Sequence, residues 1–374
     1  MTKIIISGGG TGGHVFPAIA IANAIRAKLP DAEILFIGAR GKLEMEKVPA
    51  AGYRIEGLTI AGFQRSFSLK NLSFPFKLLG SMIRARKLVS GFGPDAVIGV
   101  GGYASGPVLR IAVTGNIPAL IQEQNSYPGV TNRLLGGKVQ KICVAYEGME
   151  KYFPKEKLVL TGNPIRQDMN GLTGKRKEAL NHFGLSENKT TVLVLGGSLG
   201  AGTINRSVLK CVKTGMHGTK IQWLWQCGKY YYETSRGELE AAGLTKGSSS
   251  VNLQAFIDRM DLAYSAADVV ISRAGAIAIS ELCAAGKPAI LIPSPNVAED
   301  HQIKNALALV KKRAAILVRD NEAAGKLGGS LAALLSDIPL QEELKRNILS
   351  LAVLDAAEKI ASEVLGIIQT IKSN

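Results

Sequence analysis

The 374-residue sequence has few cysteines, few aromatic residues and no long apolar run. Its cysteines, Cys143, Cys211, Cys227 and Cys283, lie far apart without a C-x-x-C pair. That spacing argues against a disulfide framework or a zinc site and favours a reducing cytoplasm. No stretch reaches the roughly 18 to 20 apolar residues that a membrane-spanning helix needs, so we expect any membrane contact to be peripheral. The first residues are typical of a buried strand rather than a signal peptide.

Motifs that define several other enzyme classes are also missing. The sequence has no D-x-D run for a metal-bridged nucleotide diphosphate, no H-E-x-x-H zinc motif, and no G-x-S-x-G elbow in the context of a catalytic triad. It also lacks the G-K-[ST] ending of a P-loop. We therefore expect no metal and no cofactor, and we expect helix termini and arginine to stabilise the charge of any leaving group.

The sequence does carry a large excess of positive charge. Forty-five Lys and Arg against thirty Asp and Glu give a formal net charge of +15, which indicates a nucleic acid, a phosphorylated ligand or an acidic membrane as partner. A nucleic-acid-binding protein would interleave aromatic side chains with arginines, but only 6% of the residues are aromatic. Nucleic-acid binding would also not explain the glycine-rich segments at 8–13, 99–107 and 196–202. We therefore expect no nucleic-acid partner.

Strand-like apolar runs alternate with helical patterns along the whole chain. The runs cover residues 4–7, 32–37, 96–100, 119–122, 141–145 and 157–160, and then 191–195, 221–227, 250–254, 269–272 and 289–292. Strands separated by helices imply parallel sheets with right-handed crossovers. The pattern predicts an α/β fold built from doubly wound, Rossmann-like sheets.

Two similar openings indicate two similar domains. The first strand leads into glycines at 8–13 and a helix, and the strand that ends at Leu195 leads into glycines at 196–202 and another helix. The boundary is predicted at 162–164. The expected division is an N-terminal domain at 1–163, a second domain at 164–340, and a C-terminal helical segment at 341–374 that could pack back on the first domain.

Glycine-rich loops follow three of the predicted strands. Such a loop lets backbone N–H groups approach phosphate oxygens, and the next helix adds a favourable dipole. The matched loops at 8–13 and 196–202 favour phosphate binding over tight-turn packing. A third loop at 99–107 gives the first domain a second anion-binding loop, which suggests a diphosphate acceptor site unless it is only a compact turn. The residues expected there are Gly101, Gly102, Tyr103 and Ser105.

Two residues of the first domain are candidates for a general base. His14 follows the first glycine loop at the start of a helix, where it would lie beside bound phosphate with a pKa open to tuning. Glu123 lies in a polar run after another strand end, and its side chain should also reach the ligand. A lone histidine can instead be structural, so both candidates stay open.

The second domain carries candidates for hydroxyl recognition. Glu281 lies on the helix that follows the strand at 269–272. Its carboxylate would accept two hydrogen bonds from vicinal ribose hydroxyls, unless it is only a solvated helical charge. A second polar run at 299–302 is also suited to hydroxyls, although loops are often polar simply because they are exposed.

These motifs in order resemble the MurG family, the membrane-associated N-acetylglucosaminyltransferases of bacterial peptidoglycan synthesis. The resemblance covers nearly the whole chain and is carried by residues 9–17, 101–107, 123–125, 162–166, 196–198 and 275–281. It implies a GT-B glycosyltransferase whose two domains face a central cleft. The implied reaction moves N-acetylglucosamine from UDP-N-acetylglucosamine to the C4 hydroxyl of an undecaprenyl-diphosphate-linked muramyl pentapeptide. Another GT-B enzyme that acts on a glycolipid is the alternative.

The resemblance also implies which residues bind the donor, mainly in the C-terminal domain. They are Thr11, Gly12, Gly13, Asn125, Arg166, Ser198, Ile257, Ala276, Glu281 and Gln302. Backbone groups at Ile257 would contact uracil, and Ser198 with Arg166 would bind the diphosphate. Leu199 replaces a glutamine that is frequent in the family, and either His301 or Gln302 would contact the sugar hydroxyls. Because the donor site shows no obvious covalent nucleophile, we expect an inverting displacement.

Residues 63–89 interleave large apolar side chains with Lys and Arg. This pattern is typical of a surface that dips into an anionic membrane interface, although a core-packed helix with solvated lysines is the alternative. The expected membrane contacts are Leu72, Phe76 and Leu79. The expected location is peripheral, on the cytoplasmic face of the cell membrane.

Overall fold

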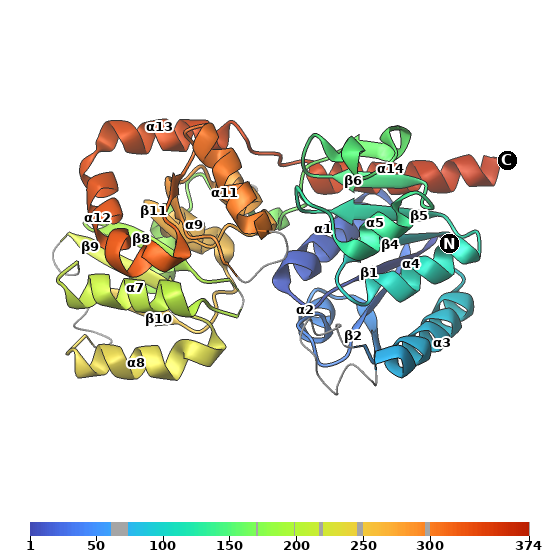
Figure 1. The fold of residues 1–374 in the computed structure, drawn as a ribbon, viewed down its shortest axis with the longest axis horizontal. Coiled ribbons are helices and arrows are strands. Elements are labelled where there is room, and N and C mark those ends of the chain that lie inside the picture. The colour runs from blue at the N-terminus through green and yellow to red at the C-terminus, as the bar shows by residue number, and fades with distance from the viewer. Residues whose placement is uncertain are drawn as a thin grey trace. The chain divides into compact units, whose positions relative to one another are not determined.

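The chain folds into two compact units. The structure, a computed structural model, describes residues 1–60, 74–169, 171–197, 199–216, 220–244, 250–295 and 300–373, with the backbone alone at 74–78 and 371–373. Unit 1 comprises Met1–Arg166 and Leu354–Asn374, and unit 2 comprises Gln167–Val353 (Figure 1). The first division follows Arg166, where the sequence predicted a boundary after residue 163, and the second precedes Leu354, where the sequence predicted a boundary at 341.

Unit 1 contains a seven-stranded parallel sheet in the order β3-β2-β1-β4-β5-β6-β7. Its strands are β1 (Lys3–Gly8), β2 (Glu33–Ala39), β3 (Arg54–Leu58), β4 (Ala96–Gly101), β5 (Ala119–Glu123), β6 (Lys141–Val144) and β7 (Leu158–Leu160). Its helices are α1 (Gly12–Lys28), α2 (Glu44–Ala50), α3 (Phe74–Phe92), α4 (Ser105–Thr114), α5 (Val130–Gly136) and α14 (Ala356–Ser373).

The continuous apolar run of β1 is explained by burial on both faces of this sheet. Ile4 and Ile6 belong to the core that α1 and α14 form, while Ile5 belongs to the core on the other face, which includes residues of α4. Successive side chains of a strand point to opposite faces, so a strand covered on both sides must be apolar at every position.

Unit 2 contains a six-stranded parallel sheet in the order β10-β9-β8-β11-β12-β13. Its strands are β8 (Thr190–Leu195), β9 (Ile221–Gln226), β10 (Val251–Gln254), β11 (Val269–Ser272), β12 (Ala289–Leu291) and β13 (Ile316–Leu317). Its helices are α6 (Arg176–Phe183), α7 (Gly202–Lys213), α8 (Tyr232–Ala241), α9 (Met260–Ala266), α10 (Ala276–Ala285), α11 (His301–Lys311), α12 (Ala323–Ser336) and α13 (Ile338–Leu349).

The prediction of two doubly wound parallel sheets is confirmed, with two strands added. The edge strand β3 has the sequence Arg-Ile-Glu-Gly-Leu, in which charge and glycine hide the strand pattern. In unit 2, the edge strand β13 has only two residues. Edge strands need fewer apolar residues than central strands, so neither β3 nor β13 forms a recognisable apolar run.

The C-terminal residues are shared between the two units. α13 packs beside α10 and α12 of unit 2, whereas α14 packs along α1 of unit 1. The α14 residues Ile360, Val364 and Ile368 are buried in the core that they form with α1 and the sheet. The segment that the sequence presented as one helical piece thus contributes to both units.

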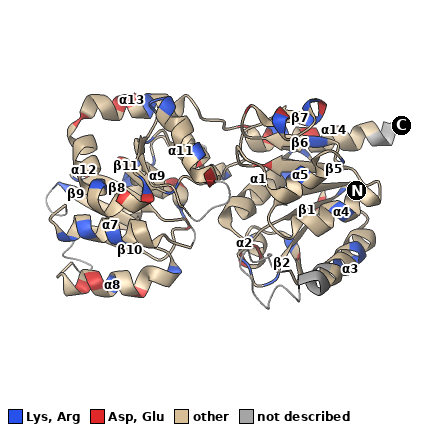
Figure 2. Cartoon of the chain, viewed as in Figure 1, with Lys and Arg blue, Asp and Glu red and all other residues tan. Residues whose placement is uncertain are grey.

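The positive charge is spread widely. Figure 2 shows Lys and Arg on helices of both units rather than gathered on a single element of the described chain. Some of these cations form ion pairs, as Arg176 does with Asp268 (2.9 Å) and Arg313 with Glu343 (2.6 Å).

Each sheet has one point at which the strand order reverses direction. In unit 1 it lies between β1 and β4, and in unit 2 between β8 and β11. Ligands of doubly wound sheets bind outside the carboxyl ends of the strands at such a switch point. The predicted glycine loops follow β1, β4 and β8, so all three lie at these two positions.

Candidate active site

The switch point of unit 1 brings two of the predicted glycine loops into contact. The Gly9 N–H donates a hydrogen bond to the Gly101 carbonyl (3.2 Å). Gly102 has φ +82°, and a Cβ added there would lie 2.2 Å from the Gly9 carbonyl oxygen. Only glycine avoids both the strained conformation and the clash. Loop 1, defined as residues 9–13, is therefore packed directly on the 99–107 loop.

His14 lies in the first turn of α1, against the second of these loops. Its Nε2 would be 3.3 Å from a Cβ built on Gly101. Its Nδ1 is buried and has no hydrogen-bond partner within the described residues. Burial lowers the pKa of His14 from 6.5 to about 4. The imidazole is consequently neutral at pH 7, the form that can accept a proton.

The depressed pKa of His14 predicts a specific pH dependence of stability. Between pH 6.5 and 4 the unfolded chain binds a proton at this imidazole and the folded chain does not. The stability that the neutral imidazole retains above pH 6.5 is thus lost as pH falls toward 4. We expect the free energy of unfolding of the wild type to fall relative to that of His14→Asn across this window, measured by urea unfolding. Parallel curves for the two proteins would contradict a neutral His14 imidazole in this pH range.

Glu123 ends β5 with both carboxylate oxygens engaged by the following loop. Oε1 accepts from the Asn125 backbone N–H (2.9 Å) and its Nδ2 (3.3 Å), and Oε2 accepts from the Gly129 N–H (3.0 Å) and Asn132 Nδ2 (2.8 Å). Burial raises the pKa of Glu123, and these four hydrogen bonds oppose that rise. The carboxylate therefore holds the loop that carries Asn125.

The remaining predicted residues of unit 1 differ in exposure. Thr11 and Tyr103 are exposed, whereas Ser105 is buried and its hydroxyl donates to the Gly102 carbonyl (2.9 Å). The Arg166 guanidinium lies over the Phe16 ring, 3.8 Å from its centroid. A Cβ on Gly12 would lie 3.1 Å from the same ring, so Arg166 and the start of α1 share one aromatic neighbour.

A buried amide network in unit 1 was not foreseen from the sequence. Gln122 Nε2 donates to Asn163 Oδ1 (3.2 Å), Asn163 Nδ2 donates to the Gln124 carbonyl (3.1 Å), and Gln124 Nε2 donates to the Val100 carbonyl (2.6 Å). The network joins the ends of β4 and β5 to the segment that leads to Arg166. Polar residues at the ends of buried strands were the available signal.

In unit 2 the glycine loop after β8 is tied to the loop after β10. Ser198 lies outside the described residues. Gln226, at the end of β9, donates from Nε2 to the Gly197 carbonyl (3.1 Å) and accepts at Oε1 from the Ile257 N–H (2.8 Å). The resemblance to the MurG family implied a donor-site role for Ile257 but none for Gln226, which connects Ile257 to the glycine loop.

Glu281 is not a solvated helical charge. It lies on α10 with only 6% of its surface exposed, and the Tyr264 hydroxyl is 3.5 Å from its Oε2. Ala276 begins the same helix directly after Gly275. A carboxylate buried on a helix that starts at the switch point is placed to bind hydroxyl donors.

Two other polar side chains of unit 2 are directed to neighbouring loops. Arg273 Nη1 donates to Asp320 Oδ1 (2.5 Å) and to the Ile292 carbonyl (2.9 Å). Gln302 Oε1 accepts from the Ser294 N–H (2.9 Å). The Arg273 contacts join the end of β11 to the segments after β12 and β13, and the Gln302 contact ties the loop after β12 to the start of α11.

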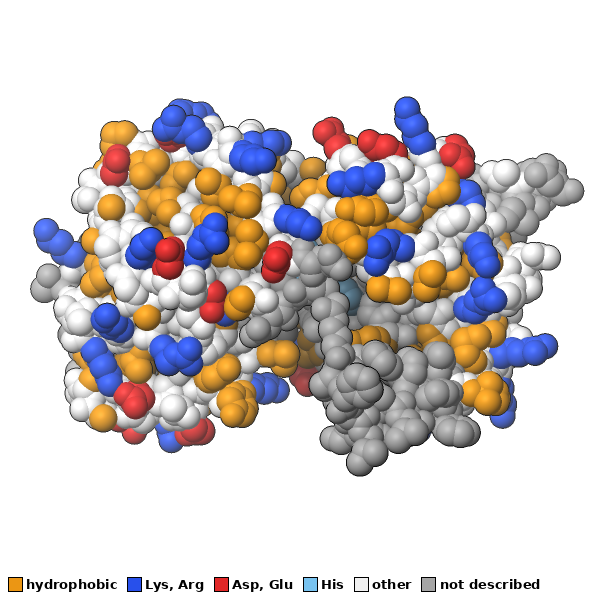
Figure 3. All heavy atoms as spheres, viewed as in Figure 1, with side chains coloured by type: hydrophobic (Ala, Val, Ile, Leu, Met, Phe, Trp, Pro, Cys, Tyr) orange, Lys and Arg blue, Asp and Glu red, His pale blue; other side chains and the backbone are white. Residues whose placement is uncertain are grey.

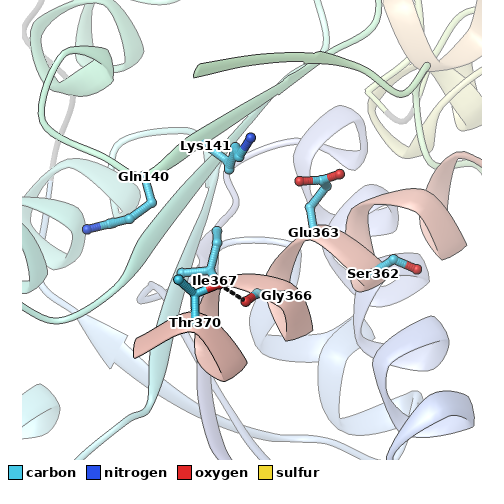
Figure 4. A pocket seen from close by; sticks show the side chains of 7 residues that line it. All are labelled: Gln140, Lys141, Ser362, Glu363, Gly366, Ile367 and Thr370. Carbon is cyan, nitrogen blue, oxygen red and sulfur yellow. Dashed lines mark hydrogen bonds between the residues drawn. The ribbon is translucent and has the colours of Figure 1, made fainter. Parts of the chain in front are cut away.

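A groove of about 380 Å³ lies elsewhere in unit 1, between β6 and α14. Figure 4 shows Lys141 and Glu363 among its lining side chains. None of the candidate site residues lines it.

Comparison with known proteins agrees with this geometry. Residues 4–144 match the glycosyltransferase family 28 N-terminal domain, and residues 191–360 match the C-terminal domain of the same family. The chain is 51% identical over 99% of both chains to a protein of Flavobacterium psychrophilum, and 54% identical over 98% of both to one of Parabacteroides distasonis. Both are named UDP-N-acetylglucosamine–N-acetylmuramyl-(pentapeptide) pyrophosphoryl-undecaprenol N-acetylglucosamine transferase.

Solved structures give the same result. The crystal structure of Acinetobacter baumannii MurG matches with a TM-score of 0.73 and 26% identity, over 98% of this chain and 100% of that one. A UDP-GlcNAc 2-epimerase from Neisseria meningitidis shares the fold at 15% identity, with a TM-score of 0.68. Two parallel-sheet units with glycine-rich loops at their switch points, together with these matches, define a glycosyltransferase of the GT-B class.

The chain belongs to glycosyltransferase family 28 and, within it, to the MurG family. The resemblance found in the sequence is thereby confirmed.

Proposed function

We propose that this chain transfers N-acetylglucosamine from UDP-N-acetylglucosamine to an undecaprenyl-diphosphate-linked N-acetylmuramyl pentapeptide. The observation that carries this conclusion is the match at 51% to 54% identity, over nearly the full length, to relatives named for that transfer. It favours this reaction over that of another GT-B enzyme. The direct test is transfer of labelled sugar to a lipid-diphosphate acceptor, compared with a glycolipid that lacks the diphosphate.

The proposed donor site lies mainly in unit 2. Ile257 would contact uracil through backbone groups, and Gln226 Oε1 accepts a hydrogen bond from the Ile257 N–H (2.8 Å). Glu281 would accept hydrogen bonds from the ribose hydroxyls, which its burial on α10 supports. The glycine loop with Ser198 and the start of α10 at Ala276 would approach the diphosphate through backbone N–H groups. Thr11, Gly12, Gly13, Asn125, Arg166 and Gln302 complete the proposed set.

The proposed acceptor site lies in unit 1. Its diphosphate would bind at the paired loops that contain Gly101, Gly102, Tyr103 and Ser105. Support comes from the direct packing of these loops and from the N-terminus of α1 beside them, which favours negative charge.

The proposed mechanism is a single inverting displacement. His14 takes the proton from the acceptor C4 hydroxyl as that oxygen attacks the anomeric carbon, and the bond from this carbon to UDP breaks with its electrons leaving on the diphosphate. Arg166 and the helix N-termini stabilise the departing charge. The neutral state of His14 supports this assignment. Negative charge on the bound acceptor would raise the pKa of His14 toward the range in which a general base is more effective.

His14 fits the role of base better than Glu123 does. The Glu123 oxygens already accept hydrogen bonds from Asn125, Gly129 and Asn132. Removing a substrate proton would require breaking those bonds and releasing the loop. We propose that Glu123 instead positions Asn125.

We propose that α3 carries a peripheral contact with an anionic membrane on its cytoplasmic face. Among the described residues, no helix is both long and apolar enough to cross a membrane. Leu79 is 61% exposed and Ile83 64% exposed, and the cations Arg86 and Lys87 are exposed on the same helix. Figure 3 shows apolar side chains beside cations in this region. The expected contact Leu72 lies outside the described residues, and so does the side chain of Phe76.

This surface predicts a loss of vesicle binding in the double variant Leu79→Ser, Ile83→Ser. Burying a large aliphatic side chain contributes about 1.5 to 3 kcal/mol, so we expect at least about tenfold weaker binding to anionic vesicles. Because both residues are exposed, thermal stability and turnover of a short-chain soluble acceptor should not change. Leu349→Ser, at an exposed leucine of α13, is the matched control. Unchanged vesicle binding in the double variant would exclude this surface.

A further inference from the structure

Glu44 is a buried carboxylate that the proposed mechanism does not use. It begins α2 and is only 1% exposed. Its Oε2 accepts the Gly10 N–H (2.8 Å), and its Oε1 accepts the Ala39 N–H (2.8 Å). Within the described residues no cation forms an ion pair with it. Its charge is therefore stabilised by backbone N–H groups.

The carboxylate lies directly against the backbone of loop 1. A Cβ on Gly9 would lie 2.1 Å from Glu44 Oε1, and one on Gly38 would lie 2.5 Å from Glu44 Cγ. Loop 1 also contacts the 99–107 loop, because a Cβ on Gly102 would lie 2.2 Å from the Gly9 carbonyl oxygen. Loop 1 is thus held between Glu44 and the 99–107 loop, and glycine is needed on both sides.

The charge of Glu44 matters for a site that binds anions. A glycine loop binds phosphate through its free N–H groups, but the Gly10 N–H already donates to a carboxylate. A second anion brought to Gly10 would also be repelled by that carboxylate. Gly12 and Gly13, in the first turn of α1, have no acceptor for their N–H groups within the helix. These N–H groups remain available to a ligand.

We propose that Glu44 is a positioning residue that occupies the anion position at Gly10, fixes loop 1 and directs a diphosphate to the N-terminus of α1. The assignment of a diphosphate to this loop rests on the proposed function. The diphosphate belongs either to the lipid acceptor or to UDP, and separate kinetics for the two substrates distinguish these sources.

The test compares Glu44→Gln with Glu46→Gln, an exposed carboxylate on the same helix. The amide of Glu44→Gln can accept only one of the two N–H groups, and it removes the charge. We expect faster amide hydrogen exchange in the peptide 6–14 and a kcat lower by about tenfold or more, since small displacements of reacting groups have large effects. We also expect inorganic pyrophosphate to bind about fivefold more tightly, because the repulsion is gone. Glu46→Gln should change none of these.

Pyrophosphate affinity separates this role from simple structural support. A residue that only stabilised the fold would, when replaced, weaken pyrophosphate binding along with turnover, and that result would overturn the proposal. Unchanged exchange and kcat in Glu44→Gln would also overturn it. The two KM values identify the diphosphate. If only the acceptor KM changes, the site binds the lipid diphosphate, and if only the UDP-N-acetylglucosamine KM changes, the site binds the donor.

Glu44→Asp covers the case in which Glu44→Gln does not fold. It keeps the charge but shortens the side chain, so we expect faster exchange in 6–14 and lower kcat without tighter pyrophosphate binding. Wild-type exchange and kcat in this variant would contradict the proposal. If the wild type itself transferred no sugar, the proposed function would fail, and faster exchange in the variants would still support the contact with loop 1.

Discussion

His14→Ala is expected to lower kcat by about 10²- to 10⁴-fold, the usual contribution of a general base. The variant removes the neutral imidazole that burial, through its lowered pKa, keeps ready to accept a proton. The KM for UDP-N-acetylglucosamine and the stabilisation by UDP should change little, because His14 has no proposed contact with the nucleotide. Steady-state kinetics at saturating donor and thermal shift with UDP measure the two quantities.

Glu123→Gln is the comparison that makes this result decisive. An amide at position 123 cannot accept all the hydrogen bonds from Asn125, Gly129 and Asn132, so we expect a lower melting temperature. His14→Ala leaves these bonds in place. Near-normal kcat in His14→Ala, together with loss of kcat and an unchanged melting temperature in Glu123→Gln, would move the base to Glu123.

Glu281→Ala is expected to weaken UDP binding by about 1.5 to 3 kcal/mol, the range for hydrogen bonds to a charged group. This corresponds to about 10- to 150-fold in Kd, which titration calorimetry measures directly. The substitution removes the buried carboxylate on α10 that would accept hydrogen bonds from the ribose hydroxyls. Glu240→Ala, at an exposed glutamate of α8, is the control.

A deoxygenated ligand tests the chemical basis of the Glu281 effect. The wild type should bind 2′-deoxy-UDP more weakly than UDP, and Glu281→Ala should lose most of that preference. Glu281→Gln keeps the side-chain volume, so it separates loss of the carboxylate from a cavity in unit 2. Equal Kd values for UDP in the wild type and both variants would remove Glu281 from the donor site.

The sequence predicted the two sheets because their central strands are buried on both faces. Such strands must be apolar at successive positions, as Ile4, Ile5 and Ile6 are, and this requirement is visible without a structure. The edge strands β3 and β13 are under no such requirement. The division of the C-terminal residues between α13 and α14 depends on which core each helix meets, which no local pattern encodes.

The glycine loops were predictable for a similar reason, and their contacts were not. Positive φ at Gly102 needs glycine locally, so the residue type reports the conformation. The contact between Glu44 and Gly10 joins residues 34 positions apart, and that between Gln226 and Ile257 joins residues 31 apart. Such contacts arise from tertiary packing, and a single sequence carries no record of them.

The fold alone does not select the reaction, since an epimerase of UDP-GlcNAc shares it. The central claim is inverting transfer to the C4 hydroxyl of a lipid-linked muramyl acceptor. The most direct measurement is NMR analysis of the product formed by the purified protein from UDP-N-acetylglucosamine and a short-chain lipid-diphosphate muramyl pentapeptide. We predict a single new β-linkage at C4 and one UDP released per sugar transferred. An α-linked product, or UDP release without transfer, would contradict the account.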